Sequence, residues 1–202
     1  MDGNFGLRID YGGYADFHSD LDEYDVIDQS MTVEPQWRID PFVCSLPIRY
    51  TYAMQDGESD YHRVSISPTA TVKIPNVNNA VEVYGIFSKS YDVDQFNDYD
   101  EDSYSRGGGI EYIFFSENRT YFRLKGDYQY IYYDAKVAAY ENTLNTSEKR
   151  HDSIISLTAE HNIQVNSYLD IFVNFTHIIA KSNVSFYDYD RNIIEAGVLL
   201  NF

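Results

Sequence analysis

The residues with the clearest chemical potential are five histidines, set among segments that alternate between polar and apolar side chains. A hydrolase needs a base within hydrogen-bond reach of its nucleophile. His18 and His151 lie in or beside long polar segments, whereas His62, His161 and His177 share the apolar side of their segments. None is expected beside a nucleophile, so the pattern predicts that the protein is not an enzyme and has no cofactor.

An acidic run resembles a metal site only in part. The run Asp98-x-Asp100-x-Asp102 begins like a calcium-binding loop, but Ser103 stands where glycine is needed and Gly109 where glutamate is needed. The single cysteine excludes a disulfide framework and a cysteine-based zinc site. We predict no metal site, and we expect the acidic loop to be solvated or to bind divalent cations loosely.

Composition narrows the class of protein. The 202 residues include 32 acidic and 15 basic side chains, giving a net charge of −17. Nucleic-acid binding needs a basic face, so this balance argues against it. We expect an ordered chain, because a disordered acidic chain should be poor in aromatic and β-branched residues, whereas this chain is rich in both and is 16% aromatic. No apolar run is long enough for a transmembrane helix, and the length fits a single domain over residues 1–202.

The dominant period of the sequence is two, which predicts β-strands with one apolar face. Turn signals divide the chain into about ten long strands. We expect them at residues 4–17, 27–39, 42–54, 61–74, 80–90, 103–115, 120–133, 152–164, 168–181 and 190–202.

Two kinds of residue interrupt the alternation. Pro47 and Pro68 fall inside predicted strands, where we expect bulges or a shifted register. The glycine run 107–109 has no following helix and so is no phosphate loop. We expect it to allow curvature or to make room for a bulky neighbour.

The connections between the predicted strands differ in length. Tight turns are expected at 40–41, 75–79, 117–119 and 166–167, and long acidic loops at 20–28, 92–102, 135–150 and 188–190. Short turns at one end and long loops at the other are typical of a transmembrane β-barrel. A soluble β-sandwich or lipocalin-like barrel also alternates. We favour a closed antiparallel membrane barrel because the strands are long and charges at their centres oppose an almost charge-free face.

The last strand supports this class through a family resemblance. Residues 195–202 alternate and end on phenylalanine, which resembles the carboxy-terminal β-signal of bacterial outer-membrane proteins. The predicted signal residues are Ile194, Ala196, Val198, Leu200 and Phe202. The resemblance implies an even number of strands, a Gram-negative outer-membrane location, and recognition by the barrel assembly machinery. It also implies a signal peptide that this chain lacks, with the short turns periplasmic and the acidic loops outside.

Strand parity predicts which side chains face lipid and which face the lumen. Tyrosine and tryptophan near strand ends are candidates for an aromatic girdle: Tyr14, Trp37, Tyr104, Tyr112, Tyr121 and Tyr132. Lys89, Arg106 and Lys181 share the lipid-facing parity, where they would extend toward lipid phosphates or form ordinary solvated surface. The predicted lumen-lining residues are Arg8, Asp10, Glu34, Arg38, Arg49, Arg63, Lys73, Glu82, Glu111, Arg123, Lys125, Asp127, Glu160, Asp170 and Glu195.

These expectations support three functions. The first is a small porin-like channel with a narrow, charged lumen for ions or small solutes, although barrels of this size are also filled by side chains. The second is a non-enzymatic surface barrel whose acidic loops bind a partner. The third is a barrel-embedded hydrolase, since Ser182-Asn183 with Glu195 is similar to lipid A deacylases; Ala180 stands where their histidine is needed. We expect a monomer whose partner is outer-membrane lipid.

Overall fold

The computed structural model describes residues 4–16, 26–55, 58–75, 77–92, 102–116, 120–136, 149–166 and 168–200, and every structural statement below concerns them. The acidic loops predicted at 20–28, 92–102 and 135–150 lie largely outside these ranges. Within the ranges, no helix is long and apolar enough to cross a membrane.

The structure is an antiparallel β-sheet, as the period of two predicts. Its strands are β1 (Asn4–Asp16), β2 (Val26–Ile39), β3 (Phe42–Ser45), β4 (Ile48–Gln55), β5 (Glu58–Ile66), β6 (Thr69–Ile74), β7 (Asn79–Asp92), β8 (Ser103–Phe115), β9 (Tyr121–Lys136), β10 (Lys149–Asn166), β11 (Leu169–Ser182) and β12 (Tyr189–Leu200). A single 3₁₀ turn, η2 (Ser185–Tyr187), lies between β11 and β12. A cis peptide bond joins Asp40 and Pro41 in the turn between β2 and β3.

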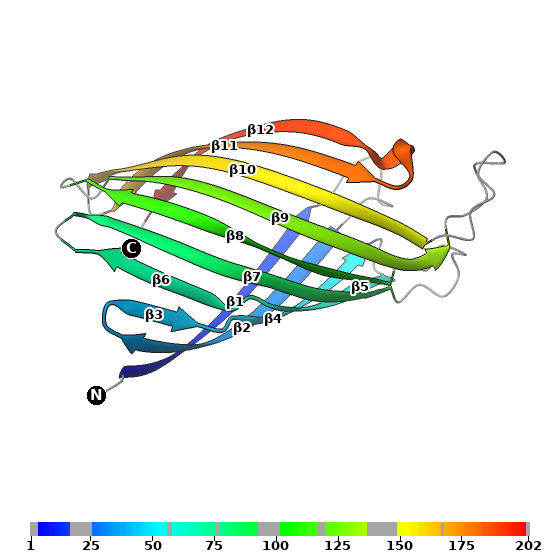
Figure 1. Cartoon of the computed structure of the whole chain (residues 1–202), viewed down its shortest axis with the longest axis horizontal. Helices are drawn as coiled ribbons and strands as arrows, with labels where there is room; N and C mark the ends of the chain where they lie inside the picture. The colour runs from blue at the N-terminus through cyan, green and yellow to red at the C-terminus, as the bar shows by residue number, and fades with distance from the viewer. Residues whose placement is uncertain are drawn as a thin grey trace.

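The strands form one twelve-stranded sheet, and β1 and β12 occupy its two ends. β3 and β4 both pair with β2, and β5 and β6 both pair with β7, so each of these couples runs end to end rather than side by side. β1 pairs with β2, and β12 pairs with β11. The sheet is strongly twisted and curled, so that β1 and β2 cross the direction of β9 and β10 (Figure 1).

The prediction of about ten strands was wrong, because two predicted strands are each divided at a proline. β3 and β4 occupy the range 42–54, and β5 and β6 occupy the range 61–74. Proline has no backbone N–H to donate to its neighbour, which ends regular pairing at Pro47 and Pro68.

The prolines do not shift the register, so the expected bulges are absent there. Gln36 pairs with Ser45 before Pro47, and Val33 pairs with Ile48 after it, at the same offset. The carbonyl oxygens of the prolines keep their partners: Ser67 N donates to Pro47 O at 3.0 Å and Gly85 N donates to Pro68 O at 2.9 Å. Each divided strand therefore remains one continuous row in the sheet.

The two faces of the sheet are inverted relative to a water-soluble protein. Large apolar side chains are exposed, including Phe5 at 62% and Ile194 at 75% of their surface. Polar and charged side chains are buried on the opposite face, including Glu111 at 8% and Glu160 at 9% exposed. The buried apolar residues in the described ranges are small: Ala53, Ala80, Ala180 and Val184. Side chains on the inside of a curved sheet shelter one another, so the face with charges, here called the polar face, is the concave one.

The glycine run in β8 brings backbones close together, which confirms its expected role. A Cβ atom on Gly108 would lie 2.6 Å from the carbonyl oxygen of Tyr84 on β7. A Cβ atom on Gly109 would meet the hydroxyl of Tyr84 and would lie 2.6 Å from the carbonyl oxygen of Gly126. Gly109 thus leaves room for the ring of Tyr84 on the polar face.

A stacked arginine fixes the β11–β12 connection against the start of β10. The guanidinium carbon of Arg150 lies 4.2 Å from the ring centre of Tyr133 and 3.5 Å from that of Tyr187. Arg150 also donates two hydrogen bonds to Asp152, at 3.1 and 2.5 Å, and Asp152 is only 4% exposed. Asn183 adds backbone contacts to the same strand end.

We expect Gly108→Ala to destabilise the protein by about 1–3 kcal/mol, because its Cβ atom would overlap a backbone oxygen that cannot rotate away. Denaturant unfolding measures the change in the free energy of unfolding. Gly12→Ala is the matched control, since its Cβ atom would find only the Ser30 hydroxyl at 3.7 Å. Equal free energies of unfolding for Gly108→Ala and the wild type would contradict the close approach of Gly108 to the Tyr84 carbonyl oxygen.

We expect Arg150→Lys to loosen the β11–β12 connection, because lysine keeps the charge but cannot make the planar stack with two hydrogen bonds. Phe186 is 81% exposed, so limited chymotrypsin digestion after Phe186 or Tyr187 reports opening of this segment. Cleavage should be severalfold faster than in the wild type. Arg191→Lys, at an exposed position of β12, is the control. Equal cleavage rates of all three proteins would contradict a role for Arg150 in holding the β11–β12 connection.

Candidate functional site

The register of the sheet puts all the charged residues predicted to line a lumen on the polar face. Glu34 lies opposite Arg8, and Glu111 lies opposite both Glu82 and Lys125. The same face carries Arg8, Asp10, Glu34, Arg38, Arg49, Arg63, Lys73, Glu82, Glu111, Arg123, Lys125, Asp127, Glu160, Asp170 and Glu195. Alternation in the sequence was sufficient to group them, because strand pairing preserves parity across the sheet.

Part of this set forms a compact ionic group, here called the central cluster: Glu82, Glu111, Arg123, Lys125, Asp127 and Glu160. Arg123 on β9 forms an ion pair with Glu160 on β10 through Nη2, and its Nη1 atom lies 3.8 Å from Oε1 of Glu111 on β8. Lys125 lies 3.5 Å from Asp127. The cluster therefore neutralises its most buried carboxylates with cations from the strand between them, as buried charges require.

Neutral donors complete the coordination of these carboxylates. Tyr84 donates to Asp127 at 3.0 Å, and Tyr121 donates to Glu160 at 2.5 Å. Thr71 donates to Glu82 at 2.6 Å. None of these donors was predicted as a site residue, although their parity places them on the polar face. The prediction that Tyr121 belongs to an aromatic girdle was wrong, because its hydroxyl is used inside the central cluster.

A hollow of about 410 Å³ adjoins the central cluster on the polar face. Arg49 and Arg63 line it from β4 and β5, and Glu82, Glu111 and Lys125 line it from β7, β8 and β9. The remaining lining is rich in hydroxyls and includes Thr51, Ser65, Ser67, Thr69 and Ser88. The hollow therefore places cationic and anionic groups around one water-accessible space.

The two arginines of the hollow are anchored by neutral hydroxyls. Arg49 Nε donates to Thr32 Oγ1 at 3.0 Å, and Arg63 Nε donates to Ser90 Oγ at 2.8 Å. Hydroxyl oxygens carry no formal charge, so these two contacts orient the guanidinium groups without neutralising them.

Other predicted residues lie outside the cluster. Arg8 forms a 2.8 Å ion pair with Asp10 on β1, and both side chains are about half exposed or more. Glu195 on β12 accepts a 2.9 Å hydrogen bond from Asn174 on β11. Charges at the two ends of the sheet are thus held locally, whereas those of β7–β10 are held together.

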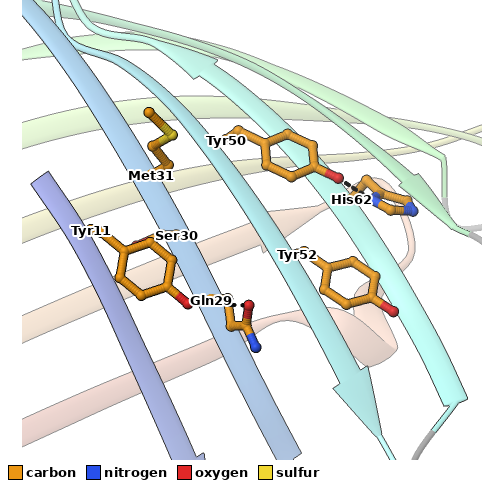
Figure 2. Close-up of a pocket in the computed structure, with 7 residues that line it drawn as sticks. All are labelled: Tyr11, Gln29, Ser30, Met31, Tyr50, Tyr52 and His62. Atoms are coloured by element: carbon orange, nitrogen blue, oxygen red, sulfur yellow. Dashed lines mark hydrogen bonds between the residues drawn. The ribbon is translucent and has the colours of Figure 1, made fainter. Parts of the chain in front are cut away.

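The apolar face carries a belt of aromatic side chains toward the end where the long loops were predicted. Figure 2 shows one part, a hollow of about 470 Å³ lined by Tyr11, Met31, Tyr50, Tyr52, His62 and neighbouring β2 residues. The Tyr50 hydroxyl lies 2.5 Å from Nδ1 of His62 (Figure 2). Farther along the belt, the rings of Tyr104 and Tyr132 stack at 5.1 Å.

The outcome for the predicted girdle differs among its members. Four members lie on the apolar face, because each is paired with another residue of that face: Trp37, Tyr104, Tyr112 and Tyr132. The side chain of Tyr14 lies outside the described residues. The prediction omitted Tyr11, Tyr50, Tyr52, Tyr91 and Tyr130, although their parity in the sequence was sufficient to include them.

Four histidines lie within the described ranges, and all of them are on the apolar face. In addition to the contact of His62 with Tyr50, the rings of His151 and Tyr130 stack with their centres 5.6 Å apart. His177 Nδ1 lies 2.9 Å from Asn192 Oδ1. His161 packs edge-on against a phenylalanine. His18 lies outside those ranges, and in the part of the chain that the structure describes no group of three or more potential metal ligands occurs.

The predicted assembly signal is described only in part. Ile194, Ala196 and Val198 lie on the apolar face of β12, and Val198 is 59% exposed. The side chain of Leu200 and the whole of Phe202 lie outside the described residues, so the signal itself stays a prediction.

Comparison with known proteins gives a family but no activity. No curated protein and no solved structure matches the chain. Residues 29–191 match a family described as "Protein of unknown function, DUF481", a range that begins in β2, ends in β12 and contains the central cluster. Since this match covers most of the sequence, the chain belongs to the DUF481 family.

Proposed function

We propose that the protein is an outer-membrane β-barrel that forms a narrow, polar channel for ions or small solutes. The inversion of the two faces carries this proposal. Isoleucine, leucine or phenylalanine side chains are exposed on all the long strands, while Glu111, Asp152 and Glu160 are buried on the opposite face. In water such an apolar surface promotes association. In a bilayer the same surface is solvated by lipid, and the sheltered polar face becomes the lumen.

Strand length supports a membrane-spanning orientation. A tilted strand of about 9–11 residues crosses the hydrocarbon core. The uninterrupted strands have 12–18 residues, from the 12 of β12 to the 18 of β10. The divided strands β3/β4 and β5/β6 have a similar combined reach because their register is unbroken.

Pairing of β1 with β12 would close the barrel. A sheet edge facing lipid leaves backbone N–H and C=O groups without partners, which is costly where no water is present. If β3 and β4 are counted as one strand, and β5 and β6 as another, the sheet has an even number of strands. An even number is required for β1 to pair with β12 in the antiparallel direction.

The size and chemistry of the lumen favour slow passage of small, polar species. Barrels of about eight strands are filled by side chains, and open channels need about 16–18. The central cluster fills part of the polar face, and the adjoining hollow of about 410 Å³ is water-accessible. Arginines and glutamates face this space together, so the expected selectivity between cations and anions is weak.

Closure is testable with engineered disulfides. In a Cys44→Ser background, Arg8→Cys is combined separately with Arg191→Cys, Ile193→Cys, Glu195→Cys or Gly197→Cys, all inward positions of β12. A closed barrel brings one of these pairs within the Cα separation of about 4.4–6.8 Å that a disulfide needs. We expect intramolecular oxidation of one pair, whereas Leu7→Cys, on the apolar face, should not react with any of them. Oxidation to covalent dimers alone would show that both edges remain open.

Channel formation is testable in planar bilayers. We expect small, discrete openings, because the central cluster narrows the lumen. Glu82→Gln should shift the reversal potential toward anion selectivity and Arg49→Gln toward cation selectivity, since each removes one charge from the hollow. Lys181→Gln, on the apolar face, should leave the reversal potential unchanged. A sealed bilayer containing correctly folded protein would exclude the channel.

A further inference from the structure

We infer that the apolar face binds a phosphate-bearing membrane lipid at a site built by Lys89 of β7 and Arg106 of β8; this inference rests on the proposed membrane-spanning function. Strand pairing brings the two cations together. Lys89 of β7 lies opposite Tyr104 of β8, and Arg106 follows Tyr104 by two residues on β8. Lys89 and Arg106 are therefore diagonal neighbours. Diagonal neighbours on one face lie about 7–8 Å apart at their Cα atoms. Two long basic side chains at this spacing can contact one phosphate group.

The electrostatic environment of these cations favours an anionic ligand. Lys89 Nζ lies 4.4 Å from the ring centre of Tyr91, and the guanidinium carbon of Arg106 lies 5.8 Å from that of Tyr130. The aromatic rings orient the cations but carry no net charge. No ion pair links either cation to a carboxylate among the described residues.

Lys181, the third predicted lipid-facing cation, shows the contrast. It forms a 2.9 Å ion pair with Asp188. Hydrogen bonds from the Ser182 amide and from Lys181 lower the pKa of the Asp188 carboxyl, so that it stays ionised at neutral pH. Lys181 already has an anionic partner, whereas Lys89 and Arg106 have aromatic ones.

A hollow beside Arg106 provides the space for an acyl chain. It measures about 610 Å³ and is lined by Phe87, Arg106, Gly107, Tyr128 and Tyr130. One row farther from the aromatic belt, Gly85 lies opposite Gly108, so neither strand projects a side chain there. The surface is therefore cationic at one end and apolar along its length, which complements a phosphate head group with a hydrocarbon tail.

The position of the site on the strands selects a lipid rather than a soluble anion. Tyrosines of the aromatic belt lie on one side of the two cations, toward the predicted long loops, and Val83, Ile110 and Leu124 lie on the other. Aromatic and basic side chains collect at the boundary between head groups and hydrocarbon. The phosphate of a lipid in the leaflet on the long-loop side would lie at this depth.

Native mass spectrometry of the detergent-solubilised full chain, titrated with phosphatidic acid, tests the site. We expect one phosphatidic acid to bind the wild type and at least a tenfold loss of affinity in Lys89→Gln/Arg106→Gln. Lys181→Gln removes a paired cation from the same face and should bind as the wild type does. Diacylglycerol should bind weakly, and excess inorganic phosphate should not displace phosphatidic acid.

Each contrary outcome overturns the site. Unchanged binding by the double variant excludes the two cations, and equal binding of diacylglycerol reduces the site to apolar contact. Displacement by excess inorganic phosphate would identify a soluble-anion site instead. Bilayer insertion and conductance of the same preparations separate the two proposals. If the wild type conducts while both proteins bind phosphatidic acid equally, only the lipid site is wrong, and failure of the wild type to insert excludes the membrane function itself.

Discussion

The ion pairs of Arg123 make the inverted sheet possible. Glu111 on β8 and Glu160 on β10 are among its most buried side chains, and unpaired carboxylates at such positions would be protonated or would destabilise the fold. Arg123 lies on the strand between them and contacts both. One guanidinium therefore ties three strands together on the polar face, where a soluble protein would pack leucine and phenylalanine. Because polar pairing holds the inside, the large apolar side chains are left for the outside.

In the proposed channel, the same arrangement limits which solutes can pass. In the central cluster Glu111 and Glu160 contact Arg123 on the strand between them, and Asp127 contacts Tyr84 of β7 and Lys125 of its own strand, so these carboxylates are held by several partners. On the side of the hollow, Arg49 and Arg63 each donate a hydrogen bond to a hydroxyl of a neighbouring strand. In the proposed channel, the hollow lined by these arginines together with Glu82, Glu111 and Lys125 is the space in which small polar solutes meet charged groups. The expected channel is therefore asymmetric in cross-section, with a filled side at β8–β10 and a more accessible side at β4–β7.

Much of this arrangement follows from the sequence because the period of a β-strand is two. Alternation alone grouped residues as distant as Arg8 and Glu195 on one face, since antiparallel pairing transmits parity from strand to strand. It could not predict which acid pairs with which base, because that depends on register. The assignment of Tyr121 failed for a different reason, because parity already placed it on the polar face. Its residue type suggested a membrane interface, but its parity directs the hydroxyl to Glu160.

A row of residues that includes prolines and glycines lies beside both the hollow on the polar face and the hollow near Arg106 on the apolar face. Leu7, Pro35, Leu46, Pro68, Gly85 and Gly108 follow one another across six neighbouring strands at a constant register. A proline lacks a backbone donor and a glycine lacks a side chain, so Pro35 and Pro68 donate no hydrogen bond along this row, and Gly85 and Gly108 add no side chain to it. Ser67 and Ile86, which flank it, line the hollow on the polar face, while Gly107 lines the hollow on the apolar face. This row therefore lies next to both hollows, and Pro68, which divides one of the predicted strands, belongs to it.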